Sequence, residues 1–243
     1  MRIALAQTRP FTGDTEANID NHISFIEAAF DQRAGLVIFP ELSITGYEPG
    51  LANALAIDPN DHRFDVMQVI SDEKKIVISV GAPTWHPTGI QISSLIFQPG
   101  EERTHYSKKF LHDDELPFFV AGIRAGFLEV EGNKIALAIC YELSVPAHSK
   151  VAADNGAAIY IASVAKTADG MANAAGQMAG IAKEYGMMAL LANCIGECDG
   201  EICAGKTAAW NKNGELIRQL GENDTGLLII DPENNTTATK LMG

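Results

Sequence analysis

The chain has 243 residues, of which 47% are hydrophobic and 20% charged, and its formal net charge at pH 7 is −13. This length and apolar content suit a single α/β domain with a large buried core. The negative charge argues against nucleic acid or anionic membrane surfaces as partners, because both attract basic patches.

The first half of the chain alternates strand-like runs with helical patterns. Residues 2–7 predict a strand, and Asp14 is a suitable N-cap for an amphipathic helix over 15–32. A strand over 36–39 is followed by a Gly- and Pro-rich stretch, 44–59, which predicts a loop with at most one short helix. The remaining elements of this half are a helix around residues 64–70 and strands over 76–83, 91–98 and 102–107.

The second half combines hairpins with further helices and strands. Turn residues predict one hairpin over 126–140 and another over 206–219, the latter around Asn213-Gly214. Residues 232–243 read as a polar C-terminal tail that contacts a partner subunit. The other elements are helices over 145–154 and 170–185 and strands over 157–162, 187–193 and 226–230. Tight hairpins among strands that also alternate with helices indicate mixed sheets.

Targeting signals and cysteine usage suggest the compartment. No apolar run approaches the length of a membrane span, and the N-terminus lacks a signal-peptide pattern, so we expect a cytoplasmic protein. The four cysteines, at 140, 194, 198 and 203, are expected to be reduced thiols. The last three lack Cys-x-x-Cys spacing and have no nearby histidine, so we expect no metal site.

Cys140 stands at the end of the most informative stretch. An apolar strand-like run, 135–139, ends at this cysteine, which is followed by polar residues and Pro146. The ends of strands carry chemistry in α/β folds, because rigid elements hold positions there that substrate can reach. A free cysteine is often only a small core residue, so the assignment depends on other segments.

Two other strand-like runs end in residues that complement a cysteine nucleophile. Glu41 follows the strand 36–39 directly after Pro40, and Lys108 lies in the charged loop after the strand 102–107. A carboxylate, a lysine and a cysteine supply a base, an oxyanion stabiliser and a nucleophile.

These three motifs, in this order, resemble the nitrilase superfamily, the carbon–nitrogen hydrolases with a Glu-Lys-Cys catalytic set. The similarity runs from residues 1–7 through Gly13-Asp14 and Asn18 to residues 227–231. It implies an α/β fold of one domain spanning 1–243, a four-layer αββα sandwich with two mixed β-sheets.

The resemblance also implies a role for each residue. Glu41 acts as general base and then as general acid, while Lys108 stabilises the oxyanion together with the backbone N–H of Tyr141. The family spacing selects Lys108 rather than Lys109. Glu115 matches the family's second glutamate, which positions the lysine.

Three more residues, Tyr47, Tyr141 and Glu142, are expected to line the substrate pocket. The Cys140-Tyr141-Glu142 sequence combines the tyrosine of amidase branches with the glutamate of true nitrilases, and the tyrosine is given more weight. His112 and His148 match no family catalytic position.

The implied function is a thiol amidohydrolase that cleaves a small linear carboxamide or N-carbamoyl compound to acid and ammonia. It needs no metal or organic cofactor, and a homodimer or larger homo-oligomer is expected. A true nitrilase acting on a small nitrile is the first alternative. A catalytically silent binding or scaffolding relative is the second, which the intact Glu41, Lys108 and Cys140 argue against.

Overall fold

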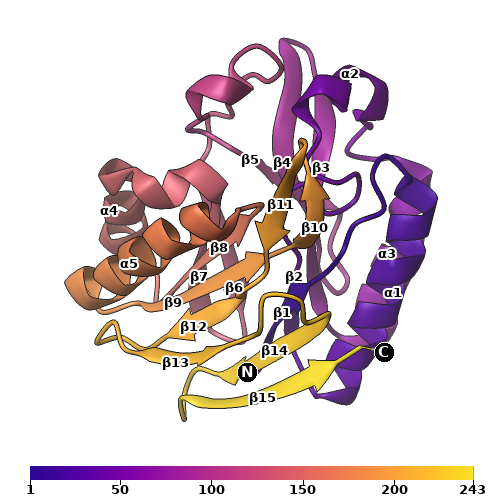
Figure 1. Ribbon diagram of the computed structural model, residues 1–243. Coiled ribbons are helices and arrows are strands. Elements are labelled where there is room, and N and C mark those ends of the chain that lie inside the picture. The colour runs from indigo at the N-terminus through magenta and orange to yellow at the C-terminus, as the bar shows by residue number, and fades with distance from the viewer. Residues whose placement is uncertain (243) are drawn as a thin grey trace.

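Two large β-sheets face each other in the computed structural model, which describes residues 1–242 (Figure 1). The first sheet has seven strands: β1 (Ile3–Gln7), β2 (Leu36–Ile38), β3 (Val77–His86), β4 (Gly89–Phe97), β5 (Thr104–Ser107), β14 (Gly226–Asp231) and β15 (Thr236–Leu241). The second has six: β6 (Gly126–Val130), β7 (Asn133–Ile139), β8 (Ile159–Val164), β9 (Met188–Asn193), β12 (Ala208–Trp210) and β13 (Leu216–Gln219).

Both sheets are mixed, as the hairpins and helical patterns predicted. Their strand orders are β15-β14-β1-β2-β3-β4-β5 and β13-β12-β9-β8-β7-β6. In each sheet three central strands are parallel, β1-β2-β3 and β7-β8-β9, and the flanking strands are antiparallel. Parallel neighbours need long crossover connections, and helices supply them here.

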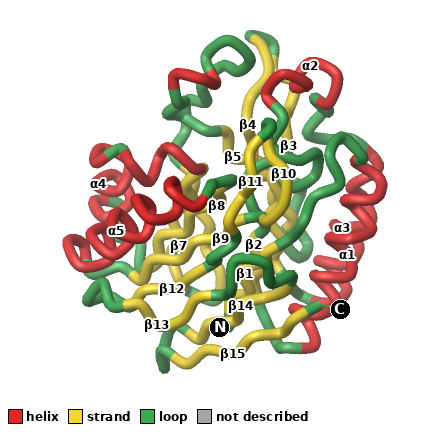
Figure 2. The backbone as a smooth tube through the Cα atoms, in the orientation of Figure 1, coloured by secondary structure: helices red, strands yellow, loops and turns green. Residues whose placement is uncertain are grey.

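The helices cover the outer faces of the two sheets, as Figure 1 and the coloured tube of Figure 2 show. The covering helices are α1 (Thr15–Asp31), α3 (Asp65–Lys74), α4 (Pro146–Asp154) and α5 (Ala168–Tyr185), while the short α2 (Ala52–Leu55) lies at one end of the sandwich. Helices α1 and α3 lie on the first sheet, and α4 and α5 lie on the second. Helix α1 begins as predicted, because the Asp14 carboxylate accepts the Ala17 N–H as an N-cap.

Three hydrophobic layers separate these four structural layers. The central one packs residues such as Leu5 and Ile38 of the first sheet against Leu137 and Ile161 of the second. One outer layer lies beneath α1 and α3, and the other lies beneath α4 and α5. This arrangement confirms the predicted αββα sandwich.

The C-terminal segment differs from the predicted polar tail. Residues Thr236–Leu241 form strand β15, which pairs antiparallel with β14 at the sheet edge. Asp231 accepts the backbone N–H groups of Glu233 and Asn234, which closes the turn between the two strands. The threonines suit a strand, but β15 is mostly exposed and carries no apolar run for sequence reading to detect.

The segment 194–205 also differs from the predicted loop of reduced thiols. It forms a hairpin of β10 (Ile195–Cys198) and β11 (Glu201–Ala204), and a disulfide joins Cys198 to Cys203. Asp199 and Gly200 both have positive φ, which suits the two-residue turn between the strands.

The predicted loop over 44–59 holds slightly more helix than expected, because a 3₁₀ turn at Pro49–Leu51 precedes α2. Three further short 3₁₀ segments connect larger elements: His62–Phe64, Asp113–Glu115 and Cys140–Ser144. Within residues 1–242, no helix combines the length and apolar character needed to cross a membrane.

Candidate active site

Glu41 and Lys108 meet between the ends of two strands of the first sheet. Glu41 lies shortly after β2 and Lys108 directly after β5. The Lys108 ammonium donates to Glu41 Oε1 with an Nζ–O distance of 2.8 Å, and both side chains are buried. Residues 67 positions apart in the sequence thus form one ion pair.

Glu115 holds the other side of this lysine. Lys108 Nζ lies 2.6 Å from Glu115 Oε1, and the same oxygen accepts the Tyr47 hydroxyl at 3.1 Å. The second oxygen of Glu115 accepts the backbone N–H of His112 at 2.8 Å. The lysine is therefore fixed between two buried carboxylates.

The two carboxylates decide the charge state of Lys108. Burial alone would lower the pKa of this ammonium, but the neighbouring Glu41 and Glu115 carboxylates oppose burial and raise it overall. Lys108 consequently stays cationic at neutral pH. Burial also raises the pKa of Glu41, against the lowering effect of Lys108, which makes Glu41 a better proton acceptor than an exposed glutamate.

Cys140 begins the 3₁₀ segment that follows β7, on the second sheet. Its φ of 45° lies in the left-handed region, which non-glycine residues rarely adopt and which is typical of strained functional turns. Burial raises the pKa of the Cys140 thiol to about 11, with Glu41 adding to the rise and Lys108 and Lys166 opposing it. The thiol is therefore protonated at neutral pH and needs a base before it can attack.

Glu41 offers an oxygen for that proton. Its Oε2 atom, which Lys108 does not bind, is buried and has no hydrogen-bond partner among residues 1–242. Glu41 and Cys140 each affect the pKa of the other group, so the two side chains are neighbours. A buried, unpaired carboxylate oxygen beside a protonated thiol is the arrangement that general-base activation requires.

A close backbone approach positions the Glu41 loop. Gly81 of β3 lies directly beneath it, and a Cβ atom at Gly81 would come within 2.4 Å of Leu42 N and 2.5 Å of Pro40 O. The loop also bonds to this strand, because Ile44 N donates to Gly81 O at 2.9 Å. Any side chain at Gly81 would displace the loop that carries Glu41, so glycine is required at this point of β3.

Helix α1 supports the same loop through a buried histidine. His22 Nε2 lies 2.9 Å from Ser43 Oγ, and His22 Nδ1 lies 2.6 Å from Asn18 O. Ser43 Oγ accepts the Gly81 N–H at 3.2 Å. If His22 Nδ1–H donates to the Asn18 carbonyl, Nε2 is free to accept the Ser43 hydroxyl. A neutral imidazole therefore satisfies every hydrogen bond from Asn18 through His22 and Ser43 to Gly81. Burial lowers the pKa of His22 to about 4, which agrees with this state.

Glu142 lies elsewhere than predicted. Instead of lining a pocket it is fully buried, and it accepts the Tyr106 hydroxyl, the Lys109 N–H and the Ile139 N–H at 2.7, 2.7 and 2.8 Å. His148 lies 3.6 Å from its other side. The reason is local, since the short 3₁₀ turn after Cys140 folds this carboxylate back onto the end of β7. Glu142 therefore fastens the lysine loop to the nucleophile turn.

The two tyrosines lie near the catalytic groups. Tyr47 is half-buried against Glu115, whereas Tyr141 is exposed and its ring meets the His112 ring edge-on. A role for either in substrate binding stays a prediction. Lys109 is exposed and lies over the Phe110 ring, so of the two adjacent lysines Lys108 is the one that reaches Glu41.

Lys166 is a neighbour of the site that sequence reasoning missed. It follows β8, the parallel neighbour of β7, so its loop emerges beside the Cys140 turn. The buried Asn193 side chain holds this loop by accepting Lys166 N–H at 2.9 Å and donating to Lys166 O at 3.0 Å. Only the pairing of β7 with β8 brings Lys166 to Cys140, and no local motif announces it.

Comparisons with known proteins show which family and which solved structures this chain is similar to. The family model described as carbon-nitrogen hydrolase matches residues 2–240. An (R)-stereoselective amidase of Pseudomonas sp is 24% identical over 227 residues, which cover 92% of this chain and 82% of that protein. A glutamine-dependent NAD(+) synthetase of Aquifex aeolicus is 26% identical over 155 residues, or 60% of this chain. That match covers just 26% of the synthetase, so this chain spans a minor part of its length.

Solved structures of an amidase from Nesterenkonia sp. AN1 have the same fold. One, with the acetamide moiety of fluoroacetamide added covalently at the active-site cysteine, has a TM-score of 0.86 and 26% identity, covering 95% of this chain and 90% of that one. Another, in complex with butyramide, has the same score and identity and covers 97% and 92%. With its sequence and fold in agreement, this chain belongs to the carbon–nitrogen hydrolase family.

Proposed function

We propose that the protein is a thiol amidohydrolase that cleaves a small linear carboxamide or N-carbamoyl compound to acid and ammonia. The observation that carries this proposal is the buried Glu41–Lys108–Glu115 cluster, with Lys108 Nζ at 2.8 and 2.6 Å from the two carboxylates. Its unpaired Glu41 oxygen adjoins the protonated thiol of Cys140.

The first half of the reaction forms a thioester. Glu41 Oε2 takes the thiol proton as the Cys140 sulfur attacks the amide carbon, and the developing oxyanion lies against Lys108 and the Tyr141 N–H. Glu41 then returns the proton to the amide nitrogen. The carbon–nitrogen bond breaks, and ammonia leaves.

The second half hydrolyses that thioester. Water enters where ammonia left, and Glu41 takes a proton from it as its oxygen attacks the thioester carbon. Lys108 stabilises the second oxyanion, the carbon–sulfur bond breaks, and the proton returns to the Cys140 sulfur. One base thus serves both halves.

The burial of the reacting groups favours small substrates. Glu41 and Lys108 are completely buried and Cys140 is half-buried, so a substrate reaches them with its amide end alone. The butyramide complex and the acetamide adduct of the Nesterenkonia amidase support the same size class.

A substrate panel tests the proposal. Ammonia release is measured with acetamide, butyramide, L-glutamine, an N-carbamoyl amine and butyronitrile. We expect turnover of at least one amide or carbamoyl compound. Turnover of the nitrile alone would identify a true nitrilase, and no turnover of any compound would favour the silent relative.

We also propose a homodimer or larger assembly in the cytoplasm. Light scattering tests the assembly, and a mass equal to the 26.0 kDa chain would contradict it. Cell fractionation tests the location, and recovery outside the cytoplasmic fraction would contradict that part.

A further inference from the structure

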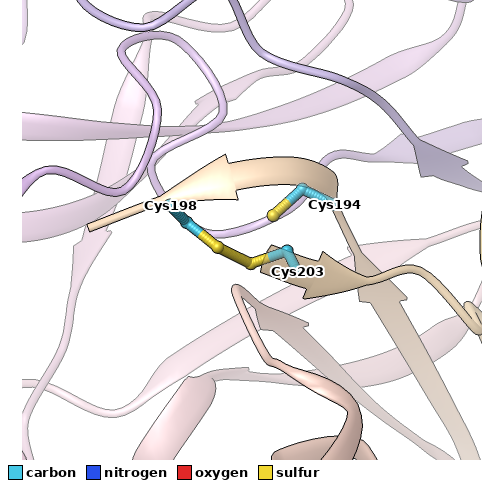
Figure 3. A group of neighbouring side chains, drawn as sticks. All are labelled: Cys194, Cys198 and Cys203. Carbon is cyan, nitrogen blue, oxygen red and sulfur yellow. A yellow bond between two sulfur atoms is a disulfide. The ribbon is translucent and has the colours of Figure 1, made fainter. Parts of the chain in front are cut away.

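The β10–β11 hairpin gathers three cysteines on one face. Cys203 pairs with Gly196 in the hairpin register, and Cys194 and Cys198 lie two residues before and after Gly196. Because alternate residues of a strand share a face, Cys203 lies diagonally between the other two. The three sulfur atoms all lie within 4.8 Å of one another. Figure 3 shows Cys198 and Cys203 joined by their disulfide with Cys194 beside them.

The bonding within this cluster is asymmetric. A disulfide joins Cys198 to Cys203, while Cys194 keeps a free, buried thiol. A thiolate next to a disulfide can displace one of its sulfurs through thiol–disulfide exchange. The cluster therefore contains the nucleophile and the bond that such an exchange requires.

We propose that these cysteines form a thiol–disulfide exchange site, in which Cys203 pairs alternately with Cys198 and with Cys194. The Cys194 thiolate attacks Cys203 Sγ, the Cys194–Cys203 bond forms, and the Cys198–Cys203 bond breaks. Cys198 leaves as a thiolate and takes up the proton that Cys194 gave up. The exchange itself needs no external oxidant or reductant.

The cluster borders the catalytic centre. The three cysteines pack against Tyr47, whose hydroxyl donates to Glu115, and against Ala165, which precedes Lys166. Burial raises the pKa of Cys194 to about 12, and the nearby Glu41 and Cys140 contribute to that rise. Cys194 is thus a thiol at neutral pH, so the exchange is faster at alkaline pH, where more of the attacking thiolate is present. A change of pair alters the surface against which Tyr47 packs.

Disulfide mapping tests the exchange without reference to activity. A Cys140→Ser protein, which lacks the catalytic thiol, is given a second substitution, Cys198→Ser. It is then incubated with glutathione disulfide and glutathione at mildly alkaline pH, quenched in acid, alkylated and mapped by mass spectrometry. We expect a Cys194–Cys203 disulfide. Alkylated Cys194 together with glutathionylated Cys203 would overturn the proposal.

Matched proteins control this experiment. The Cys203→Ser counterpart lacks the sulfur that both pairs share, so neither the Cys198–Cys203 nor the Cys194–Cys203 disulfide can form in it. The Cys140→Ser protein with no further change is also incubated at alkaline pH, without added oxidant. It keeps all three hairpin cysteines, so it tests the exchange even if the double variant does not fold. We expect a fraction of these molecules to carry the Cys194–Cys203 disulfide. Finding the Cys198–Cys203 disulfide alone at every time point would overturn the exchange.

The coupling to Tyr47 has its own readout, which rests on the proposed amidase function. The KM for a turned-over amide is compared between wild type and Cys198→Ser oxidised to the Cys194–Cys203 form. We expect a several-fold change in KM with a smaller change in kcat. Equal KM values would overturn the coupling but not the exchange, and failure of hydrolysis itself leaves the mapping result intact.

Discussion

At the scale of single residues, the site combines a cation fixed between two carboxylates with a thiol that is protonated at rest. Lys108 neutralises one of the two negative charges, and Glu41 keeps one oxygen unpaired for the Cys140 proton. A buried charge without a partner costs several kcal/mol, so each member of the cluster requires the others.

Replacing the two adjacent lysines tests which of them acts. Lys108→Met should lower kcat by about a hundred- to a thousandfold, because one oxyanion donor is lost. It should also reduce stability by roughly 3–5 kcal/mol, because Glu41 and Glu115 lose their buried counter-ion. Lys109→Met is the matched control, and both its kinetics and its urea unfolding should stay close to wild type. If Lys109→Met lowered kcat more than Lys108→Met, the assignment of the acting lysine would be wrong by one residue.

Lys166 should influence the nucleophile through its charge. Because that charge lowers the pKa of Cys140, Lys166→Gln should raise it and slow alkylation of Cys140 by iodoacetamide at any fixed pH below about 11. Lys212→Gln removes an exposed lysine and serves as the control. Equal alkylation rates in all three proteins would show that Lys166 does not act on this thiol.

At the scale of elements, Glu41, Lys108 and Cys140, the proposed catalytic residues, all follow strand ends, and a glycine allows the Glu41 loop to approach β3 closely. Gly81→Ala should displace the Glu41 loop, since the added Cβ would lie 2.4 Å from Leu42 N. We expect a loss of kcat together with a loss of stability. Gly176 is an exposed glycine of α5, and an added Cβ there would meet open space, so Gly176→Ala should leave kcat unchanged and stabilise the protein by up to about 1 kcal/mol. Unchanged kcat in Gly81→Ala would contradict the positioning role.

The junction of α1 with the Glu41 loop should make stability depend on pH. The pKa of His22 falls from 6.5 to about 4 on folding, so below pH 6.5 the unfolded chain binds a proton that the folded one does not. Stability from this residue is present at neutral pH and is lost as the pH falls from about 6.5 to about 4. The loss at pH 5 relative to pH 7 should be about 2 kcal/mol. Urea unfolding measures it, and His22→Gln should show a smaller loss; an equal loss would contradict the assignment.

At the scale of the whole molecule, the sequence predicts the sheets well and the surface hairpins poorly. Apolar runs mark buried strands such as β2 and β7, and Glu41 and Cys140 follow their ends. Lys108 follows the polar strand β5, so the family spacing rather than an apolar run selects it. β15 is polar and exposed, and β10 and β11 are only four residues each. None of these three strands therefore leaves a hydrophobic pattern in the sequence.

Contacts made by tertiary structure are the other part that the sequence did not reveal. Lys166 comes near Cys140 through the pairing of β7 with β8, and His22 reaches Ser43 from another element. Each depends on how strands and helices pack, and spacing along the chain does not encode that packing.

The central claim is that an amide becomes a thioester on Cys140. Hydroxylamine intercepts a thioester and yields a hydroxamate, which is measured by its ferric complex during amide turnover. Wild-type protein should form the hydroxamate, and Cys140→Ala should form none while unfolding in urea much as wild type does. Hydroxamate formation by folded Cys140→Ala, or rapid nitrile hydrolysis with no ammonia from the matching amide, would contradict the account.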